Sequence, residues 1–106
     1  MYEEGRRGIL ALRGETVTID STGEKAKESF GDAKALGNGI HAGQWNDFRI
    51  VAKGNHLQHF INGTLTSEVI DEQPEKSAAT GVIALQLHRG PAMTVRFKDI
   101  VVRPIQ

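Results

Sequence analysis

The chain of 106 residues contains no cysteine, which excludes disulfide bonds and thiolate chemistry and leaves the redox compartment unreadable from cysteine usage. No apolar run approaches the roughly 20 residues that a membrane-spanning helix needs. Thirteen basic and thirteen acidic residues cancel, so no strong field would draw the chain to nucleic acid or an anionic membrane. We therefore expect neither of these as a partner.

The first residues also lack a targeting signal. Met1 to Arg7 carries charges without the apolar segment that follows them in a signal peptide. The length is enough for one domain with a modest core and is too short for two.

The sequence is instead rich in turns, with twelve glycines and few helical patterns, which indicates an all-β chain. Alternating apolar and polar residues, bounded by turn signals, predict strands. A helical pattern over Glu24 to Glu28 is an equal alternative to the strand predicted at Lys25–Phe30. Asp32 to Leu36, followed by a glycine, predicts a single helical turn. The strands are predicted at Arg7–Leu12, Thr16–Asp20, Lys25–Phe30, Asp47–Lys53, His56–Ile61, Thr64–Val69, Gly81–Gly90 and Met93–Val102.

Short strands at regular spacing favour an antiparallel β-sandwich or jelly roll. Asn62–Gly63 suits the positive φ angles of a tight hairpin turn between two of the strands. The polar loop from Asp71 to Thr80 contains Pro74 where it can open one helical turn. Because Arg7–Leu12 is predicted as a strand or only a strand end, and Lys25–Phe30 has a helical alternative, we count about six or seven strands. This is fewer than the eight of a closed jelly roll, so we expect an incomplete domain.

The stretch from Gly81 to Gly90 is the most apolar in the chain, and two polar residues interrupt it. Because a strand sends alternate side chains to opposite faces, Gln86 and His88 would lie on one face. A histidine can act as a general base near neutral pH, and a glutamine can donate to and accept from sugar hydroxyls. The alternative is that His88 merely caps a strand and bonds to the backbone.

Two further segments contain candidate site residues. Tyr2 to Gly8 places paired carboxylates beside arginines, which can supply a general acid or base and an anion clamp, although a solvated, frayed terminus is the simpler interpretation. Trp45, next to Asn46, is the only tryptophan; it can stack on a sugar, but a core anchor is the commoner role.

No pattern in the chain identifies a metal site. His41, His56 and His59 have no ligand spacing, because residues three apart on a strand face opposite sides. Asp71 and Glu72 lie in a loop without the carboxylate spacing of a calcium site. The motifs of phosphate loops, zinc sites and nucleophilic serines are also missing.

Taken together, an ordered set of segments resembles the 3-keto-disaccharide hydrolase domain family, and the resemblance covers essentially the whole chain. No single motif decides it. The segments are Met-Tyr-Glu-Glu-Gly-Arg-Arg-Gly-Ile-Leu-Ala, Glu-Ser-Phe-Gly-Asp-Ala, Gln-Trp-Asn-Asp-Phe, Ala-Lys-Gly-Asn-His-Leu, Ile-Asn-Gly and Gly-Val-Ile-Ala-Leu-Gln-Leu-His-Arg-Gly-Pro-Ala-Met-Thr-Val-Arg-Phe-Lys-Asp-Ile. The family's glycine-proline-proline loop stands here as Gly90-Pro91-Ala92.

The resemblance implies a concanavalin A-like lectin/glucanase jelly roll, of which residues 1–106 would form the C-terminal portion. Family members have further strands before the segment that matches Tyr2 to Glu4. The family pattern marks a cleft-lining set of Glu4, Arg7, Gln86 and His88. It also matches Trp45 and Asn46, at a structural corner that we include among the substrate-binding candidates.

The implied activity is cleavage of a 3-keto-glycoside, with His88 and Glu4 as acid/base candidates and with Gln86 and Arg7 as the groups that orient the substrate and stabilise the oxyanion. A divalent metal or hydrogen-bond donors would stabilise the enolate, and the sequence leaves the cofactor undetermined. A carbohydrate-binding module and an inactive fragment are alternative interpretations. The resemblance further implies a periplasmic or extracellular location, and an uncovered sheet predicts pairing with a missing half of the domain or a second copy.

Overall fold

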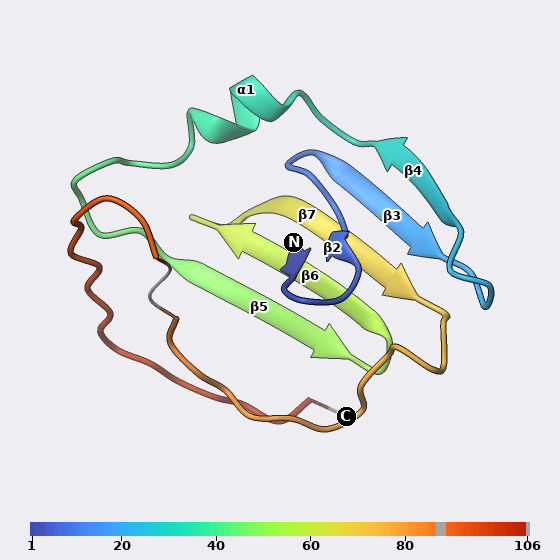
Figure 1. Ribbon diagram of the computed structural model, residues 1–106. Coiled ribbons are helices and arrows are strands. Elements are labelled where there is room, and N and C mark those ends of the chain that lie inside the picture. Colours follow the sequence, from blue (N-terminus) through green and yellow to red (C-terminus); the bar gives the residue numbers. More distant parts are fainter. Residues whose placement is uncertain (87–88, 106) are drawn as a thin grey trace.

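The computed structural model of the chain describes residues 1–86 and 89–105, and its strands form one sheet of five and one of two (Figure 1). The large sheet has the strand order β4-β3-β7-β6-β5, and β1 pairs with β2. The elements are β1 (Tyr2–Glu3), β2 (Gly8–Ile9), β3 (Glu15–Ile19), β4 (Lys25–Ser29), α1 (Ala33–Gly37), β5 (Phe48–Lys53), β6 (His56–Ile61) and β7 (Thr64–Asp71).

The described residues confirm the all-β class, because their one helix, α1, has five residues. That helix starts where the sequence predicts it, with the Asp32 side chain accepting a hydrogen bond from the Ala35 amide at 3.0 Å. Asn62 and Gly63 have φ angles of 51° and 81°, as the predicted hairpin turn between β6 and β7 requires. The six predicted strands before residue 70 all appear, the first as the short β2.

One strand pair in the large sheet is parallel. β7 returns after β5 and β6 and inserts beside β3, pairing Val17 with Val69 and Ile19 with Asp71. The other pairs in this sheet are antiparallel. Residues more than fifty positions apart therefore meet at the middle of the sheet, and this long-range pairing positions the candidate site.

The core lies on the face of the sheet that the N-terminal segment crosses (Figure 1). Val17, Ile19 and Val69 are completely buried there, because Leu10 and Ala11 pack over them. We call this the covered face. Because each fully buried aliphatic side chain stabilises the folded state, these three side chains together contribute several kcal/mol to the free energy of folding. The N-terminal segment is thus part of the folded unit rather than a frayed end.

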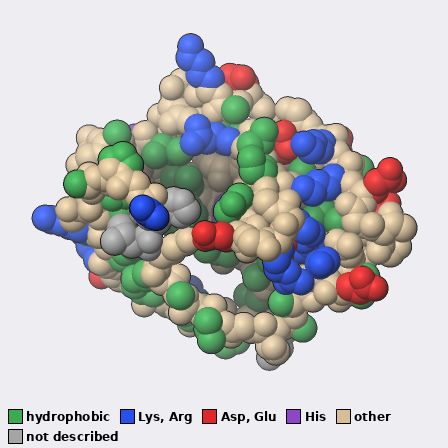
Figure 2. Space-filling model, viewed as in Figure 1, with side chains coloured by type: hydrophobic (Ala, Val, Ile, Leu, Met, Phe, Trp, Pro, Cys, Tyr) green, Lys and Arg blue, Asp and Glu red, His purple; other side chains and the backbone are tan. Residues whose placement is uncertain are grey.

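The strands predicted at Gly81–Gly90 and Met93–Val102 are wrong in the residues that the structure describes: 81–86, 89–90 and 93–102 form no strand. Leu87 and His88 lie outside the described residues. We call the described residues 81–86 and 89–105 the C-terminal segment. Its apolar side chains point to solvent, with Val82 93% exposed. Figure 2 shows an open gap between this segment and the sheet, with hydrophobic as well as charged side chains at its edge. An alternating pattern forms a strand only where a neighbouring strand and a facing surface are available.

In the part of the chain that the structure describes, no helix has the length and apolarity needed to cross a membrane.

Candidate functional site

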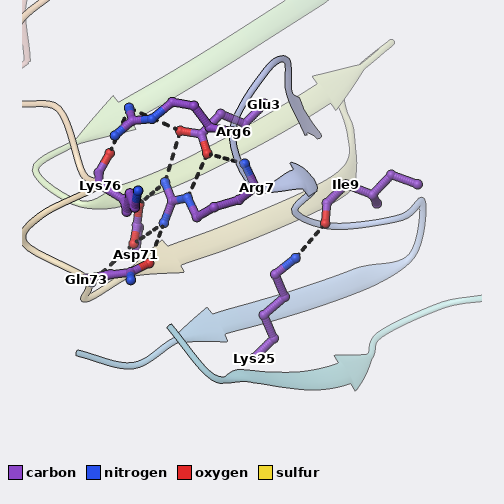
Figure 3. Close-up of polar contacts among 8 residues, drawn as sticks. All are labelled: Glu3, Arg6, Arg7, Ile9, Lys25, Asp71, Gln73 and Lys76. Carbon is purple, nitrogen blue, oxygen red and sulfur yellow. Dashed lines mark hydrogen bonds and ion pairs between the residues drawn. The ribbon is translucent and has the colours of Figure 1, made fainter. Parts of the chain in front are cut away.

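The predicted site residues at the N-terminus lie on a tight turn that joins β1 to β2. Gly5 and Gly8 adopt φ angles of 73° and 71°, which only glycine takes without strain, so the turn reverses within four residues. The turn holds Arg7 between Glu3 and the end of β7, where Asp71 lies (Figure 3). Glu4 lies in the same turn and is exposed.

The Arg7 guanidinium gives all five of its N–H donors to protein acceptors. Nε donates to Glu3 Oε2 at 2.7 Å, and Nη2 donates to Glu3 Oε1 at 3.1 Å and to Asp71 Oδ2 at 2.8 Å. Nη1 donates to Asp71 Oδ1 at 3.0 Å and to Gln73 Oε1 at 3.3 Å. A guanidinium has five donors, so none remains for a ligand. The geometry makes Arg7 the group that fastens the N-terminal turn to β7.

Burial strengthens this network, since the side chains of Arg7 and Asp71 are only 14% and 7% exposed. The hydrogen bonds from Arg7 hold the pKa of Glu3 and that of Asp71 below their usual values, against the opposing effect of burial. The hydrogen bonds to Glu3 and Asp71 in turn raise the pKa of Arg7. All three groups are therefore charged at neutral pH, and neither carboxylate is poised to exchange a proton there.

Glu4 and Gln86, which the sequence predicts to line one cleft, are brought together across 82 positions of the chain. Gln86 Nε2 donates to Glu4 Oε2 at 2.8 Å, and both side chains are exposed. Gln86 also lines a shallow hollow beside the contact, together with Leu85, Met93, Thr94, Val95 and Phe97. A carboxylate and an amide next to an apolar hollow can bind a hydroxylated ligand, because each group keeps unused acceptor or donor capacity.

The other predicted members of the site do not join this contact in the described residues. His88 lies outside them. Asn46 uses its side chain to join its own loop to the turn between β6 and β7. Its Oδ1 accepts from the His41 amide and from Asn62 Nδ2, both at 2.8 Å, and its Nδ2 donates to the His41 carbonyl at 2.8 Å. Trp45 is exposed, and Lys98 Nζ lies over its ring at 4.3 Å. The geometry of Asn46 fits the structural corner.

Histidine positions agree with the expectation that His56 and His59 face opposite sides of β6. His56 contacts Glu68 on one face, whereas His59 stacks against Phe48 at 5.6 Å between ring centroids on the other. Burial lowers the pKa of His59. Within residues 1–86 and 89–105, no group of three or more His, Asp or Glu side chains is placed to hold a metal ion.

Sequence reasoning missed the partners of Arg7. Glu3 precedes Arg7 by four positions, so the sequence already placed an acidic residue close enough to form an ion pair with Arg7. Asp71 and Gln73 meet Arg7 only because β7 lies parallel to β3, and no local signal in the sequence specifies that pairing. Asp71, which the sequence analysis placed in a loop, instead ends β7 and accepts hydrogen bonds from Arg7.

Comparison with protein families places these features in context. The model of the 3-keto-alpha-glucoside-1,2-lyase-like domain matches residues 6–103, nearly the whole chain. The chain belongs to this family. The comparisons with curated proteins and with solved structures found no match.

Proposed function

We propose that this chain is a carbohydrate-active domain that cleaves the glycosidic bond of a 3-keto-glucoside. The family match over residues 6–103 is the observation that carries the proposal, since the family is described by 1,2-lyase chemistry on 3-keto-alpha-glucosides. The 2.8 Å contact between Glu4 and Gln86 supports it, because it joins a carboxylate and an amide beside a hollow.

The chemistry needs a base, a leaving-group acid and stabilisation of an enolate. The ketone at C3 acidifies the proton on C2, so a base removes that proton and the electron pair forms the enolate. The enolate then re-forms the ketone and expels the C1 oxygen substituent, which takes up a proton, leaving a double bond between C1 and C2. Water adds across this bond to complete a net hydrolysis.

We assign acid/base work to Glu4 and His88, and orientation of the substrate to Gln86. In this proposal Arg7 does not orient the substrate, which is the role that the family resemblance implied for it. Because its five donors are all engaged, it holds the turn that presents Glu4 and does not contact the substrate. Glu4 accepts only one hydrogen bond within the described residues, so its carboxylate is available for proton transfer.

The test is release of the aglycone from a 3-keto-α-glucoside by the purified chain and by two variants. We expect Glu4→Gln to lower kcat/KM about 100-fold, the usual loss for a general acid or base, and His88→Ala to cause a loss of similar size. Lys27→Ala, an exposed change on β4, serves as the control and should retain full activity. No release by the wild type, or unchanged rates in both variants, would refute the proposal.

A binding module is the second candidate, and the exposed position of Glu4 and Gln86 favours it over deep-pocket catalysis. Saturable binding of a glycan in a calorimeter, with no turnover of the 3-keto-glucoside, would identify that function. For either function we propose a periplasmic or extracellular location, which fractionation of the producing cells would test.

A further inference from the structure

The face of the large sheet opposite the core contains a polar cluster that the proposed function does not use. Thr16 on β3, Glu68 on β7 and Gln58 on β6 lie side by side in the register of the three strands. His56 precedes Gln58 by two positions on β6 and therefore points to the same side. We call this side of the sheet, opposite the covered face, the polar face.

Glu68 organises the cluster by accepting three hydrogen bonds. Thr16 Oγ1 donates to its Oε1 at 2.9 Å, Gln58 Nε2 donates to its Oε2 at 2.7 Å, and His56 Nε2 contacts the same Oε2 at 2.6 Å. Burial of Glu68 would raise its pKa, but hydrogen bonds from these three neighbours hold the pKa below its usual value. The carboxylate is therefore ionised and can only accept, so Nε2 of His56 carries the proton.

This arrangement leaves unused polar atoms that face outward. In the described residues, Nδ1 of His56 and Oε1 of Gln58 have no hydrogen-bond partner. Because Nε2 of His56 is directed at Glu68, Nδ1 is left for a ligand, as an acceptor in the neutral ring or a donor in the protonated ring, and Gln58 keeps one N–H donor. The side chain of His56 is 40% exposed and that of Glu68 is 16% exposed, so a ligand can reach the imidazole while the carboxylate stays fixed behind it.

An aromatic surface continues the polar face along β6. Phe60 lies two positions beyond Gln58, and the Arg49 guanidinium of β5 lies 5.5 Å from the ring centroid. Arg49 is exposed and adds donors at the edge of the cluster. Fixed donors and acceptors beside an apolar ring match the mixed surface of a neutral polyol, whose hydroxyls alternate with C–H faces.

Other ligand classes fit the cluster less well. The ionised Glu68 at its centre repels an anion. A metal ion would require His56 Nε2 and Glu68 to release each other, and the described residues supply no third ligand nearby.

We propose that the polar face is a second binding site, which takes a neutral, hydroxyl-rich ligand such as a sugar through His56, Gln58 and Arg49. This site is distinct from the Glu4–Gln86 contact, because the N-terminal turn lies over the covered face and the cluster lies on the opposite side of the sheet. It binds without turnover, so it does not depend on the proposed lyase activity.

The imidazole resonances of the four histidines provide the readout, with methyl α-glucoside and sucrose as probes. Neither probe has a 3-keto group, so the experiment is independent of catalysis. We expect a saturable shift of the His56 carbon-bound protons and no shift of His59, which faces the other side. Gln58→Ala should raise the Kd about 5- to 10-fold, the value of one or two hydrogen bonds, and Lys27→Ala should leave it unchanged.

Glu68→Gln tests the organising role and should weaken binding by a similar factor, because the imidazole loses its charged acceptor. If that variant fails to fold, the folded Gln58→Ala and His56→Ala variants decide. The absence of a saturable His56 shift in the wild type, or equal affinity in wild type and Gln58→Ala, would overturn the proposal.

Discussion

Residues 8–71 and residues 81–105 contain similar alternations of apolar and polar side chains, yet strands form in the first region and not in the described part of the second, residues 81–86 and 89–105. In the first region, Val17, Ile19 and Val69 are fully buried. In the second region, Val82 is almost fully exposed and Ile83 is largely exposed. Alternation specifies which side chains share a face, and burial requires a second surface to cover that face.

The two regions also differ in how they are fastened. The N-terminal turn is bound to the end of β7 through the five hydrogen bonds of Arg7. The C-terminal segment reaches the N-terminal turn through the exposed contact between Gln86 and Glu4. The folded region is therefore held by burial and charge, whereas the proposed active site depends on a contact between two exposed side chains.

The largest expected effect separates a buried from an exposed isoleucine on the same sheet face. Ile19→Ala should lower the free energy of unfolding by about 3 kcal/mol, because it removes completely buried methyl groups and leaves a cavity. Ile50→Ala, at a position 60% exposed, should cost less than about 1 kcal/mol. Urea unfolding followed by circular dichroism measures both, and equal losses would mean that β5 is covered in solution.

A smaller effect should separate two neighbouring arginines. Arg7→Met leaves the largely buried Asp71 without its ion pair and leaves Glu3 with only the exposed Arg6, so we expect a loss of about 3 kcal/mol at most. Arg6→Met should cost about 0.5 kcal/mol or less, since Arg6 is exposed and lies 3.7 Å from Glu3. The same urea titration applies, and a tolerant Arg7 would show that the N-terminal turn is not fastened as described.

Acid should weaken the same network. The folded-state pKa values of Glu3 and Asp71 are lowered from ordinary values of 4.5 and 3.8, so their contribution is complete above pH 4.5. It is lost as the pH falls through the lowered values of the folded state. Thermal unfolding from pH 7 downward should show a falling Tm below pH 4.5, and Arg7→Met should flatten that fall. A parallel decline in both proteins would assign the acid sensitivity to other groups.

The smallest effect is expected in the C-terminal segment. Val82→Ser should change the free energy of unfolding by no more than about 0.5 kcal/mol, because the side chain is 93% exposed. The self-association predicted from the uncovered apolar residues should fall in this variant, as light scattering would show. A large loss of stability would instead mean that residues 81–86 pack against a partner in solution.

Predictions from the sequence are confirmed where the structure depends on residues that are neighbours in the chain. The Asp32 cap of α1, the Asn62–Gly63 turn and the alternation of β3 follow from local chemistry, and all are present. The parallel pairing of Val17 with Val69 and the assignment of Arg7 to Asp71 depend on contacts across the chain, which periodicity does not encode.

The dependence on contacts across the chain also explains why the strand prediction at residues 81–86 was wrong. The alternating pattern at residues 81–86 indicates which side chains would share one face of a strand. It does not specify which other residues would cover that face. The site residues were matched from the family, and the structure joins two of them, Glu4 and Gln86, while it occupies the donors of Arg7 and the amide of Asn46 elsewhere. His88 stays a prediction, since it lies outside the described residues.

The most direct test of the account is a double-mutant cycle on Glu4 and Gln86, measured as kcat/KM for aglycone release from a 3-keto-α-glucoside. If the two side chains form one site, Glu4→Ala and Gln86→Ala should be coupled, and the double variant should lose little more activity than Glu4→Ala alone. Losses that multiply would show that the two residues act independently, and would contradict a site built from the contact between the two regions.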